Sequence, residues 1–478
     1  MTQSLLLKKI HSDGIKFNGV SSDTRTLVKG NLFFAIKGSN SDGLNYIDHA
    51  YRKDASAVVI SNRKKISNIS ERLPIYIVKD VRKEFAIAAF SINKNNITHK
   101  IGVTGTNGKT SVTFYINYIL DKINIKSATI GTLGNSAFKK NKGNLTTPSS
   151  LDLARQLSAI YRKKIDHVSI EASSHGLDQK RFSGLQFNVG ILTNISRDHL
   201  DYHKTMDNYI SSKAKLFNDY LSQNAKIIIN SETKYLTQFL KKIKNLKSKE
   251  LILFQKNNDF KLLKLNLRKN DVNVSVIISG KKFNLVFSNL PLFQIKNFLI
   301  AASAVSCMGY NLANLSTISK KCPNVSGRME YVGLSKKGGK VYVDFAHTPD
   351  ALLNVLKEIK QTNPSKIILI FGCGGDRDKG KRSKMGVIAK KYADIVIVTD
   401  DNPRYEDATK IRKEIIQNSN FFVEISNRKK AIKHGISKLE KKSVLLIAGK
   451  GHEKTQIING KIYNFDDVVV AKKLMKQI

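Results

Sequence analysis

Short apolar runs alternate along the chain with stretches in which apolar positions recur every three or four residues. Residues 100–104 form one such run, and residues 111–123 follow it with the helical spacing. The apolar positions of the second stretch are Val112, Ile116, Ile119, Leu120 and Ile123. A short apolar run is typical of a buried strand, and the second spacing is typical of a helix with one buried face. The pattern therefore predicts a strand at 100–104 that leads into a helix at 111–123.

The same alternation predicts strands in three parts of the chain. The first part has apolar runs at residues 31–37, 55–60 and 74–79, and the middle part has them at 167–172, 189–194 and 225–230. The last part has them at 341–345, 366–371, 394–399, 421–425 and 444–448, with helical stretches at 349–359 and 407–417. Strands that alternate with helices predict parallel, doubly wound sheets with right-handed crossovers. Residues 271–287 alternate apolar and polar positions around Ser279-Gly280, which predicts an antiparallel hairpin.

The length and two breaks in the pattern predict three domains. A chain of 478 residues is long enough for about three domains. Residues 93–100 are mostly polar, and the segment Cys-Pro-Asn-Val-Ser-Gly-Arg at 322–328 interrupts the alternation. We therefore expect an α/β protein with domains at residues 1–98, 99–325 and 326–478. The central domain is predicted to hold a P-loop-type doubly wound sheet, and the last domain a Rossmann-like sheet.

The composition is that of a globular protein without a membrane span. Hydrophobic residues make up 41% of the chain, and no run of about 18 apolar residues occurs. The apolar stretch at the start is too short for a signal peptide, and its charges follow it instead of preceding it. The cysteines are too widely spaced for a disulfide framework or a metal knuckle; they are Cys307, Cys322 and Cys373. We expect a cytoplasmic protein.

The net charge of +43, from 81 basic and 38 acidic residues, leaves two interpretations open. Binding of nucleic acid through phosphate neutralisation would use such a charge. A lysine-rich composition that makes every exposed face basic would produce the same number. The lysines are scattered through all regions, and the chain has no tryptophan for base stacking. We favour the second interpretation and expect neither nucleic acid nor membrane among the partners, although an anionic nucleotide would be attracted by this charge.

The segment between the strand at 100–104 and the helix at 111–123 is typical of a phosphate-binding loop. It reads Gly105-Thr-Asn-Gly-Lys-Thr110. Glycines that open a helix present backbone N–H groups and the positive end of the helix dipole to an anion. Lys109 adds a point charge for the outer phosphates, and Thr110 adds a hydroxyl for Mg²⁺. The usual spacing would require glycine in place of Val103, so this is a compact form of the motif. We predict ATP binding by Gly105, Thr106, Asn107, Gly108, Lys109 and Thr110.

Two further polar residues follow predicted strands of the middle part. Glu171 ends the run at 167–172, and His199 comes shortly after the run at 189–194. If both strands run parallel to the strand at 100–104, Thr110, Glu171 and His199 meet above one edge of the sheet. Carboxylate and hydroxyl oxygens suit Mg²⁺, and an imidazole is a less usual ligand. The alternative is that Glu171 and His199 only cap neighbouring elements.

Polar and glycine-rich clusters also follow the predicted strands of the last part. They lie at residues 344–347, 372–382, 400–404 and 449–453. Ligands of doubly wound sheets bind beyond the carboxyl ends of the strands. Because four such clusters share one predicted rim, we expect a second binding site there.

Taken together, these motifs resemble the Mur ligase family, the ATP-dependent enzymes that add amino acids to the peptidoglycan precursor. The resemblance covers essentially the whole chain and is to the MurE type, which extends UDP-N-acetylmuramoyl-L-alanyl-D-glutamate. It rests on Gly105-Thr-Asn-Gly-Lys-Thr110, Thr146-Thr-Pro148, Glu171-Ala-Ser-Ser-His-Gly176, Asn194-Ile-Ser-Arg-Asp-His-Leu-Asp-Tyr-His203, Asp344-Phe-Ala-His-Thr-Pro349 and Gly449-Lys-Gly-His-Glu453. It implies a UDP-binding first domain, an ATP-binding central domain and an amino-acid-binding last domain.

The resemblance implies roles for residues that match the family's motifs. The uridine diphosphate end would be held by Ser22, Thr24, Ser39, Asn40 and Ser41, and the sugar-peptide part by Thr146, Thr147, Ser173, Gln179 and Arg181. The nucleotide would also contact Asn297, Arg328 and Asp344, although Gln294 stands where the family more usually has asparagine. Lys213 matches the lysine that the family carries as a carbamate, which would help to bind a second Mg²⁺. The alternative for Lys213 is an ordinary exposed lysine.

The resemblance also indicates the incoming amino acid. Asp401-Asn402-Pro403-Arg404 matches the motif that goes with meso-2,6-diaminopimelate, and Arg377, Gly449 and Glu453 match the other positions around that amino acid. Diaminopimelate differs from lysine by a second carboxylate, which an arginine can hold through a charge-assisted fork. Glu453 suits an ammonium group. The alternative for Arg404 is a surface ion pair with Glu406 or Asp407.

The implied reaction is amide formation through an acyl phosphate on the D-glutamate side chain. Lys109, Lys213 and His199 are the candidate catalytic residues, and the charge that develops on the phosphoryl group would be neutralised by Lys109 and by Mg²⁺, of which we expect two ions. His199 and His347 both remain open as the acceptor of the amine's proton. We expect a monomer.

Two rival functions are open. A folylpolyglutamate synthetase would share the loop but lack the module of about a hundred residues ahead of it. A nucleic-acid-binding NTPase would need a basic stripe or a recognition module.

Overall fold

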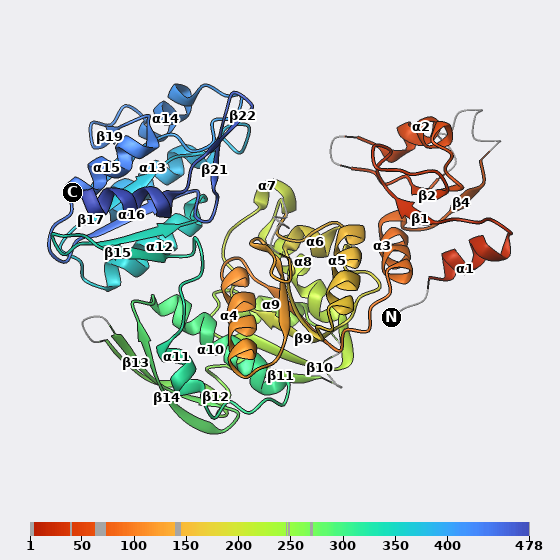
Figure 1. The fold of residues 1–478 in the computed structure, drawn as a ribbon, viewed down its shortest axis with the longest axis horizontal. Helices are drawn as coiled ribbons and strands as arrows, with labels where there is room; N and C mark the ends of the chain where they lie inside the picture. The colour runs from red at the N-terminus through yellow and green to blue at the C-terminus, as the bar shows by residue number, and fades with distance from the viewer. Residues whose placement is uncertain are drawn as a thin grey trace. The chain divides into compact units, whose positions relative to one another are not determined.

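The computed structural model describes residues 4–38, 41–62, 73–138, 145–244, 246, 249–267 and 271–477. The chain folds into two compact units, and both mix helices with sheets, as predicted (Figure 1). The first unit comprises residues 1–195, 199–261 and 300–311, and the second comprises residues 196–198, 262–299 and 312–478. No helix among the described residues is both long and apolar enough to cross a membrane.

The N-terminal part of the first unit holds a four-stranded parallel sheet. Its strands lie in chain order: β1 (Gly19–Ser21), β2 (Asn31–Phe34), β3 (Ala57–Ile60) and β4 (Ile75–Ile77). The helices of this part are α1 (Leu5–Ser12), η1 (Gly43–Tyr46), α2 (Ile47–Arg52) and α3 (Val81–Ile92). The side chain of Asp80 caps α3 by accepting the backbone N–H of Lys83, and α3 buries Phe85 and Phe90 in the same core as β2.

The first unit also holds a seven-stranded sheet with the order β11-β10-β9-β5-β8-β6-β7. All neighbours pair in parallel except β6 and β7. The strands are β5 (His99–Thr104), β6 (Ser127–Gly131), β7 (Gly134–Asn135), β8 (His167–Glu171), β9 (Phe187–Leu192), β10 (Leu221–Asn230) and β11 (Glu250–Phe254). The helices are α4 (Lys109–Lys122), α5 (Ser150–Arg162), α6 (Ser174–Asp178), α7 (Leu200–His203), α8 (Met206–Asp219) and α9 (Leu236–Lys242). The predicted parallel, doubly wound sheet is confirmed.

The predicted hairpin is present and belongs to a separate sheet. Strands β13 (Asp271–Ile278) and β14 (Lys281–Ser288) pair antiparallel, and β12 (Phe260–Leu267) lies on the other side of β13. Ser279 and Gly280 both have positive φ, +49° and +74°, which is the geometry of a tight two-residue hairpin turn. Helix α11 (Leu315–Lys320) packs on β14, and α10 (Leu292–Cys307) precedes it in the chain.

The last part of the second unit is a six-stranded sheet with the order β15-β16-β20-β17-β18-β19. Only β15 runs antiparallel to its neighbour. The strands are β15 (Glu330–Leu334), β16 (Lys340–Asp344), β17 (Ile367–Phe371), β18 (Ile395–Val398), β19 (Phe422–Glu424) and β20 (Val444–Ala448). Strands β21 (Thr455–Ile458) and β22 (Lys461–Asn464) form a separate hairpin.

Helices cover both faces of this six-stranded sheet. They are α12 (Pro349–Gln361), α13 (Lys381–Tyr392), α14 (Ala408–Ile416), α15 (Arg428–Ser437) and α16 (Asp467–Gln477). The first three share one apolar core with the sheet, and α15 and α16 share another. The two cores on opposite faces are the physical reason that the strands read as continuous apolar runs.

Candidate functional site

The predicted phosphate loop lies between β5 and α4, in the first unit. Gly105 and Gly108 have φ angles of +149° and +84°, which favour glycine. A Cβ atom on Gly105 would lie 1.9 Å from Thr193 Oγ1, so no side chain fits there. The loop after β9 supports this turn, because the N–H groups of Thr106 and Asn107 donate to the backbone and side-chain oxygens of Asn194, both at 2.9 Å.

Lys109 folds over this loop. Its Nζ atom donates to the carbonyl oxygens of Gly105 and Thr106, each at 2.9 Å. The positive charge therefore lies next to the N-terminal end of α4, where the helix dipole also favours an anion. The local arrangement fits the predicted site for the phosphates of ATP.

Glu171 ends β8 and faces Thr110, as the strand-end argument predicts. The side chain is 1% exposed, and its Oε2 accepts hydrogen bonds from the hydroxyls of Thr110 and Thr132, each at 3.0 Å. Its Oε1 accepts the backbone N–H of Thr132 at 2.8 Å. Gly131 makes room for this carboxylate, because a Cβ there would lie 2.2 Å from Oε1. Glu171 therefore does more than cap a neighbouring element, which was the alternative interpretation.

Thr132 was not among the predicted residues, although a signal for it exists. Thr132 follows β6, which pairs in parallel with β8, so the same strand-end argument would have placed it beside Glu171. Its hydroxyl also lies 3.3 Å from the hydroxyl of Thr146, a residue predicted to hold the sugar-peptide part.

Lys213 is deeply buried on α8. Its side chain is 1% exposed, and Nζ donates to Gly105 O at 2.8 Å and lies 4.4 Å from the ring centroid of Tyr209. The Tyr209 hydroxyl is within 3.0 Å of Thr106 Oγ1 in the phosphate loop. The alternative of an ordinary exposed lysine is therefore wrong, and a carbamate on Lys213 would lie beside this loop.

His199 belongs to an aromatic cluster next to these residues. It precedes α7 in a left-handed conformation with φ +53°, and its ring centroid lies 4.8 Å from that of His175 and 6.3 Å from that of Tyr209. The described residues contain no group of three His, Cys, Asp or Glu side chains arranged to hold a metal. The Thr110 hydroxyl and the Glu171 carboxylate suit Mg²⁺, which usually takes its remaining ligands from water and substrate phosphates.

The residues predicted for the uridine end lie in loops of the N-terminal sheet. Ser22 and Thr24 follow β1, and Ser41 lies in the loop after β2. Because β1 and β2 are parallel neighbours, these loops leave the same edge of the sheet. The backbone oxygen of Thr24 accepts a hydrogen bond from Lys53 Nζ at 2.7 Å. Ser39 and Asn40 lie outside the described residues.

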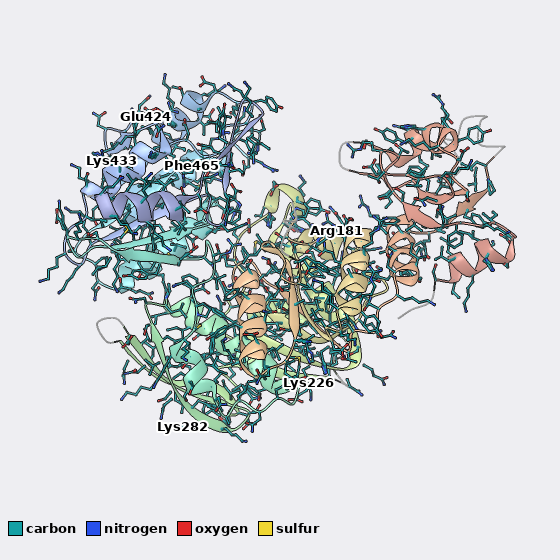
Figure 2. The ribbon with its side chains drawn as sticks, viewed as in Figure 1. Arg181, Lys226, Lys282, Glu424, Lys433 and Phe465 are labelled. Carbon is teal, nitrogen blue, oxygen red and sulfur yellow. The ribbon has the colours of Figure 1, made fainter. Side chains whose placement is uncertain are left out.

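Four of the five residues predicted for the sugar-peptide part form one hydrogen-bonded group in the first unit. The Thr147 hydroxyl donates to Glu171 O at 2.6 Å and accepts the N–H of Ser173 at 3.0 Å. Arg181, which is labelled in Figure 2, donates to Thr147 O, and its Nη2 donates to Gln179 Oε1 at 2.7 Å. This group is therefore tied to the backbone of Glu171 itself.

Three residues predicted for the nucleotide come together in the second unit. Asn297 on α10 contacts Gln294 at 3.3 Å, and Gln294 Nε2 donates to Arg328 O at 2.8 Å. The Arg328 guanidinium lies 4.7 Å from the centroid of the Phe345 ring. Asp344 accepts the N–H groups of Met329 and Ala346 at 2.6 and 2.7 Å. Burial raises the pKa of Asp344 to about 6, although the charge of Arg328 opposes this.

The motif at 401–404 follows β18 and is bound to the hairpin of β21 and β22. The backbone N–H of Arg404 donates to Ile457 O at 3.1 Å, and Gln456 Nε2 donates to Asp401 O at 2.7 Å. Asn402 is 5% exposed, and its Nδ2 donates to Glu453 Oε2 at 2.9 Å. The structure therefore brings the predicted amino-acid residues of two distant segments together.

The loop after β17 supplies the other side of this region. Arg404 Nη1 donates to Gly375 O at 2.7 Å, and Arg377 is exposed in the same loop. Gly449 lies close to the motif, since a Cβ there would lie 2.7 Å from Asp401 Oδ2. The residues predicted at the rim of the C-terminal sheet therefore do lie close together.

The alternative of an ion pair between Arg404 and Glu406 or Asp407 is not what the structure contains. Glu406 is bound in a fork by Arg382, at 2.8 Å for each oxygen, and this arginine lowers the pKa of Glu406 to about 2. Asp407 caps α14 by accepting the N–H of Thr409 at 2.8 Å. Because both acidic residues are bound to other partners, Arg404 contacts the loop after β17 instead.

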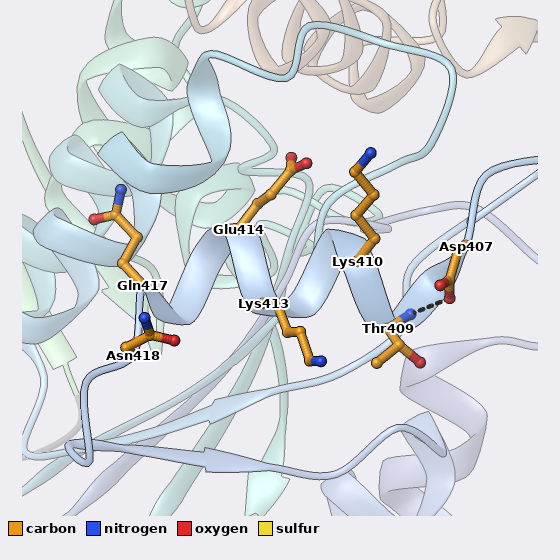
Figure 3. A pocket seen from close by; sticks show the side chains of 7 residues that line it. All are labelled: Asp407, Thr409, Lys410, Lys413, Glu414, Gln417 and Asn418. Carbon is orange, nitrogen blue, oxygen red and sulfur yellow. Dashed lines mark hydrogen bonds between the residues drawn. The ribbon is translucent and has the colours of Figure 1, made fainter.

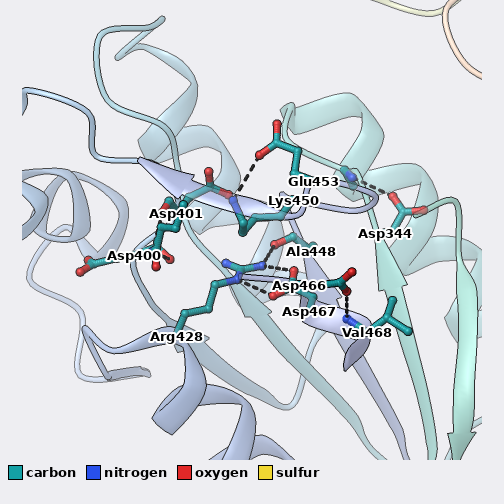
Figure 4. A network of polar contacts seen from close by, with 12 residues as sticks. Asp344, Asp400, Asp401, Arg428, Ala448, Lys450, Glu453, Asp466, Asp467 and Val468 are labelled. Carbon is teal, nitrogen blue, oxygen red and sulfur yellow. Dashed lines mark hydrogen bonds and ion pairs between the residues drawn. The ribbon is translucent and has the colours of Figure 1, made fainter. Parts of the chain in front are cut away.

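Three buried charged residues near this rim were not among the predicted site residues. Arg428 and Asp467 are each fully buried and form a two-bond ion pair at 2.7 and 2.8 Å, and Arg428 Nη2 also donates to Ala448 O at 3.0 Å (Figure 4). Lys450 is also fully buried. The predicted cluster at 449–453 includes Lys450, whereas only the rule that a buried charge needs a partner could have indicated Arg428 and Asp467.

A shallow pocket lies elsewhere, along α14 (Figure 3). Its lining is polar and charged and consists of Asp407, Thr409, Lys410, Lys413, Glu414, Gln417 and Asn418. It contains none of the predicted site residues. We assign it no function.

Comparisons with known proteins agree with this geometry. Three family models match successive segments: the "Mur ligase family, catalytic domain" at residues 16–97, the "Mur ligase middle domain" at 103–305 and the "Mur ligase, glutamate ligase domain" at 327–451. The UDP-N-acetylmuramoyl-L-alanyl-D-glutamate–2,6-diaminopimelate ligase of Rickettsia bellii is 38% identical over 465 residues, covering 95% of this chain and 94% of the relative.

Solved structures show the same likeness. A structure of a ligase of the same name has a TM-score of 0.68 and 30% identity, covering 96% of this chain and 95% of that one. MurF from Thermotoga maritima in complex with ADP has a TM-score of 0.62 at 16% identity, with coverage of 97% and 98%, and supports the fold alone. Relatives that match over nearly their full length and three matching family models lead to the same conclusion: the chain belongs to the Mur ligase family.

Proposed function

We propose that the protein is an ATP-dependent ligase that adds meso-2,6-diaminopimelate to UDP-N-acetylmuramoyl-L-alanyl-D-glutamate, giving ADP, phosphate and the tripeptide nucleotide. The observation that supports this choice most directly is the cluster of Asn402, Arg404 and Glu453 at the rim of the C-terminal sheet. A cation and an anion held at one rim match an amino acid that carries both ammonium and carboxylate groups.

The γ-phosphoryl group of ATP passes to the side-chain carboxylate of D-glutamate and forms an acyl phosphate. The loop at 105–110 holds the phosphates, and Lys109 neutralises the negative charge that develops during transfer. The amine of diaminopimelate then attacks the acyl carbon, the bond to the phosphate oxygen breaks, and phosphate leaves. His199 and His347 remain the candidate acceptors of the amine's proton.

Mg²⁺ would be held by Thr110 and Glu171, with His199 and Lys213 near a second ion. When bound, the metal supplies positive charge that stabilises the phosphoryl oxygens. A carbamate on Lys213 would convert a buried cation into an anion that can bind metal. The position of Lys213 Nζ beside the Gly105 carbonyl supports this role.

Arg404 would bind the distal carboxylate that distinguishes diaminopimelate from lysine, and Glu453 would bind an ammonium group. Arg377, Gly449 and Asp401 complete this subsite. Because a site that desolvates an arginine leaves its charge unpaired when lysine binds, lysine should be a poor substrate.

The remaining assignments follow from the same proposal. The domains are residues 1–98, 99–325 and 326–478, with UDP bound in the first, ATP in the second and diaminopimelate in the third. Ser22, Thr24 and Ser41 would hold the uridine diphosphate end, and the group around Thr147 and Arg181 the sugar-peptide part. The protein acts as a monomer in the cytoplasm.

One assay tests the proposal. The purified protein is incubated with ATP, Mg²⁺ and the UDP-muramoyl dipeptide, and with either diaminopimelate or lysine, and the product is identified by its mass. We expect the tripeptide nucleotide with diaminopimelate and little product with lysine. Equal use of lysine would contradict the role of Arg404, and absence of any tripeptide nucleotide would contradict the function.

A further inference from the structure

Lys450 lies fully buried among the residues proposed to bind the amino acid. Its Nζ atom donates to Glu453 Oε2 at 3.2 Å (Figure 4). It also donates to Thr455 O at 2.6 Å and to Asn402 Oδ1 at 3.1 Å. A lysine ammonium has three N–H donors, so these acceptors satisfy all of them. A buried ammonium also needs a counter-charge, and Glu453 is the carboxylate that it contacts.

The two donors around Asn402 Oδ1 determine how this amide is oriented. Asn402 Oδ1 accepts from Lys450 Nζ and from the backbone N–H of Ile457 at 3.0 Å. A rotation of the amide by 180° would place its NH₂ group against these donors and its oxygen against the carboxylate of Glu453. Because both new contacts would be repulsive, the observed orientation is the stable one.

The oriented amide in turn holds Glu453 by a single oxygen. Oε2 of Glu453 accepts from both Asn402 Nδ2 at 2.9 Å and Lys450 Nζ. Among the described residues, Oε1 accepts no hydrogen bond, and the side chain is 35% exposed. One carboxylate oxygen is therefore fixed by the protein, and the other is available to a ligand.

We propose that Lys450 is a positioning residue for the incoming amino acid. It fixes the Asn402 amide and one oxygen of Glu453, so that the second oxygen is presented to the ammonium group of the substrate. This inference rests on the proposed function and deepens it, because it concerns the same subsite. Lys450 does not touch the substrate itself.

The test compares Lys450→Met with Lys454→Met, a matched change at an exposed lysine four positions away. Methionine has a similar length but no ammonium. We expect the KM for diaminopimelate to rise at least tenfold in Lys450→Met, with the KM for ATP changed less than twofold. Lys454→Met should keep both values. An unchanged KM for diaminopimelate in folded Lys450→Met would overturn the inference.

A double-mutant cycle separates positioning from general support of the fold. If Lys450 acts through Glu453, adding Lys450→Met to Glu453→Gln should raise the KM for diaminopimelate less than threefold further. A full additional tenfold rise would show that the two residues act independently and would overturn the inference.

A second variant covers the case in which Lys450→Met does not fold. Asn402→Asp keeps an acceptor for Lys450 and Ile457, but it removes the N–H group that donates a hydrogen bond to Glu453. We expect the same tenfold rise in the KM for diaminopimelate, and an unchanged KM would overturn the inference. If the parent protein forms no tripeptide nucleotide, the proposed function fails; if it does and these variants match it, only the role of Lys450 fails.

Discussion

Replacing Glu171 with glutamine tests the proposed metal site with little disturbance of the fold. Glutamine has the shape of glutamate, but one carboxylate oxygen becomes an NH₂ donor. If this NH₂ faced the backbone N–H of Thr132, two donors would oppose each other at a cost of about 1–3 kcal/mol. If it faced the hydroxyls of Thr110 and Thr132, each hydroxyl could rotate and accept. The amide will therefore adopt the second orientation and keep all three contacts.

The magnitudes follow from this geometry. Because the three hydrogen bonds remain and only their charge assistance is lost, we expect Glu171→Gln to lower the free energy of unfolding by no more than about 1 kcal/mol, or a few degrees in Tm. Activity should respond far more strongly, since the neutral amide is a poor ligand for Mg²⁺. We expect kcat/KM to fall at least 100-fold, which corresponds to about 2.7 kcal/mol of transition-state stabilisation.

The assay is phosphate release at increasing Mg²⁺ concentration, with the UDP-muramoyl dipeptide and diaminopimelate present and with thermal unfolding measured in parallel. Thr132→Val is the control, because it removes one hydrogen bond to the same carboxylate without changing its charge, and it should cost less than tenfold in kcat/KM. Full activity of folded Glu171→Gln with an unchanged Mg²⁺ dependence would show that this carboxylate only accepts hydrogen bonds and would refute the reasoning.

Three further predictions concern other parts of the chain. Lys213→Ala should reduce turnover at least 100-fold, and added short-chain carboxylic acids should restore part of it; unchanged turnover would contradict the carbamate. Arg404→Ala should raise the KM for diaminopimelate at least tenfold more than the KM for ATP, because a charge-assisted hydrogen bond is worth about 1.5–3 kcal/mol; equal effects would contradict its role. His167 stacks on His99 at 4.3 Å, and burial together with the charge of His99 lowers the pKa of His167 to about 4. Since the unfolded chain binds this proton below about pH 6.5, stability should fall by about 1–2 kcal/mol as the pH drops from 6.5 to 4, measured by denaturant titration. His167→Gln should weaken this dependence of stability on pH. An equal loss of stability in that variant between pH 6.5 and 4 would contradict the prediction.

The buried strands could be located from the sequence because parallel strands covered on both faces consist of continuous apolar residues. The run at 444–448 coincides with β20, and the run at 366–371 differs from β17 by one residue. The edge strands were harder to find. β7 is only two residues long, and β15 has a single buried position with partly or fully exposed residues on both sides of it, so neither has the apolar run on which the prediction depended.

The position of Glu171 opposite Thr110 was predictable for a related reason. Glu171 ends β8 and Thr110 follows β5, and because these two strands pair in parallel, their carboxyl ends lie at one edge of the sheet. Thr132 escaped prediction because nothing in its neighbourhood is unusual until β6 is known to pair with β8. A hydroxyl becomes informative only when its acceptor is identified.

The charged network beneath the C-terminal rim shows why motifs alone cannot describe a site. The chain orders its segments as β16, β17, β18 and then β20, but the sheet places β20 between β16 and β17. The loop after β20 is therefore central to the rim, although it is the last of the four in sequence. That position lets Lys450 reach Asn402, 48 residues earlier in the chain, and a glutamate three residues later at the same time. A buried lysine in a sequence predicts that acceptors must exist, but strand order decides which acceptors they are, and so which ligand-binding groups the lysine can hold in place.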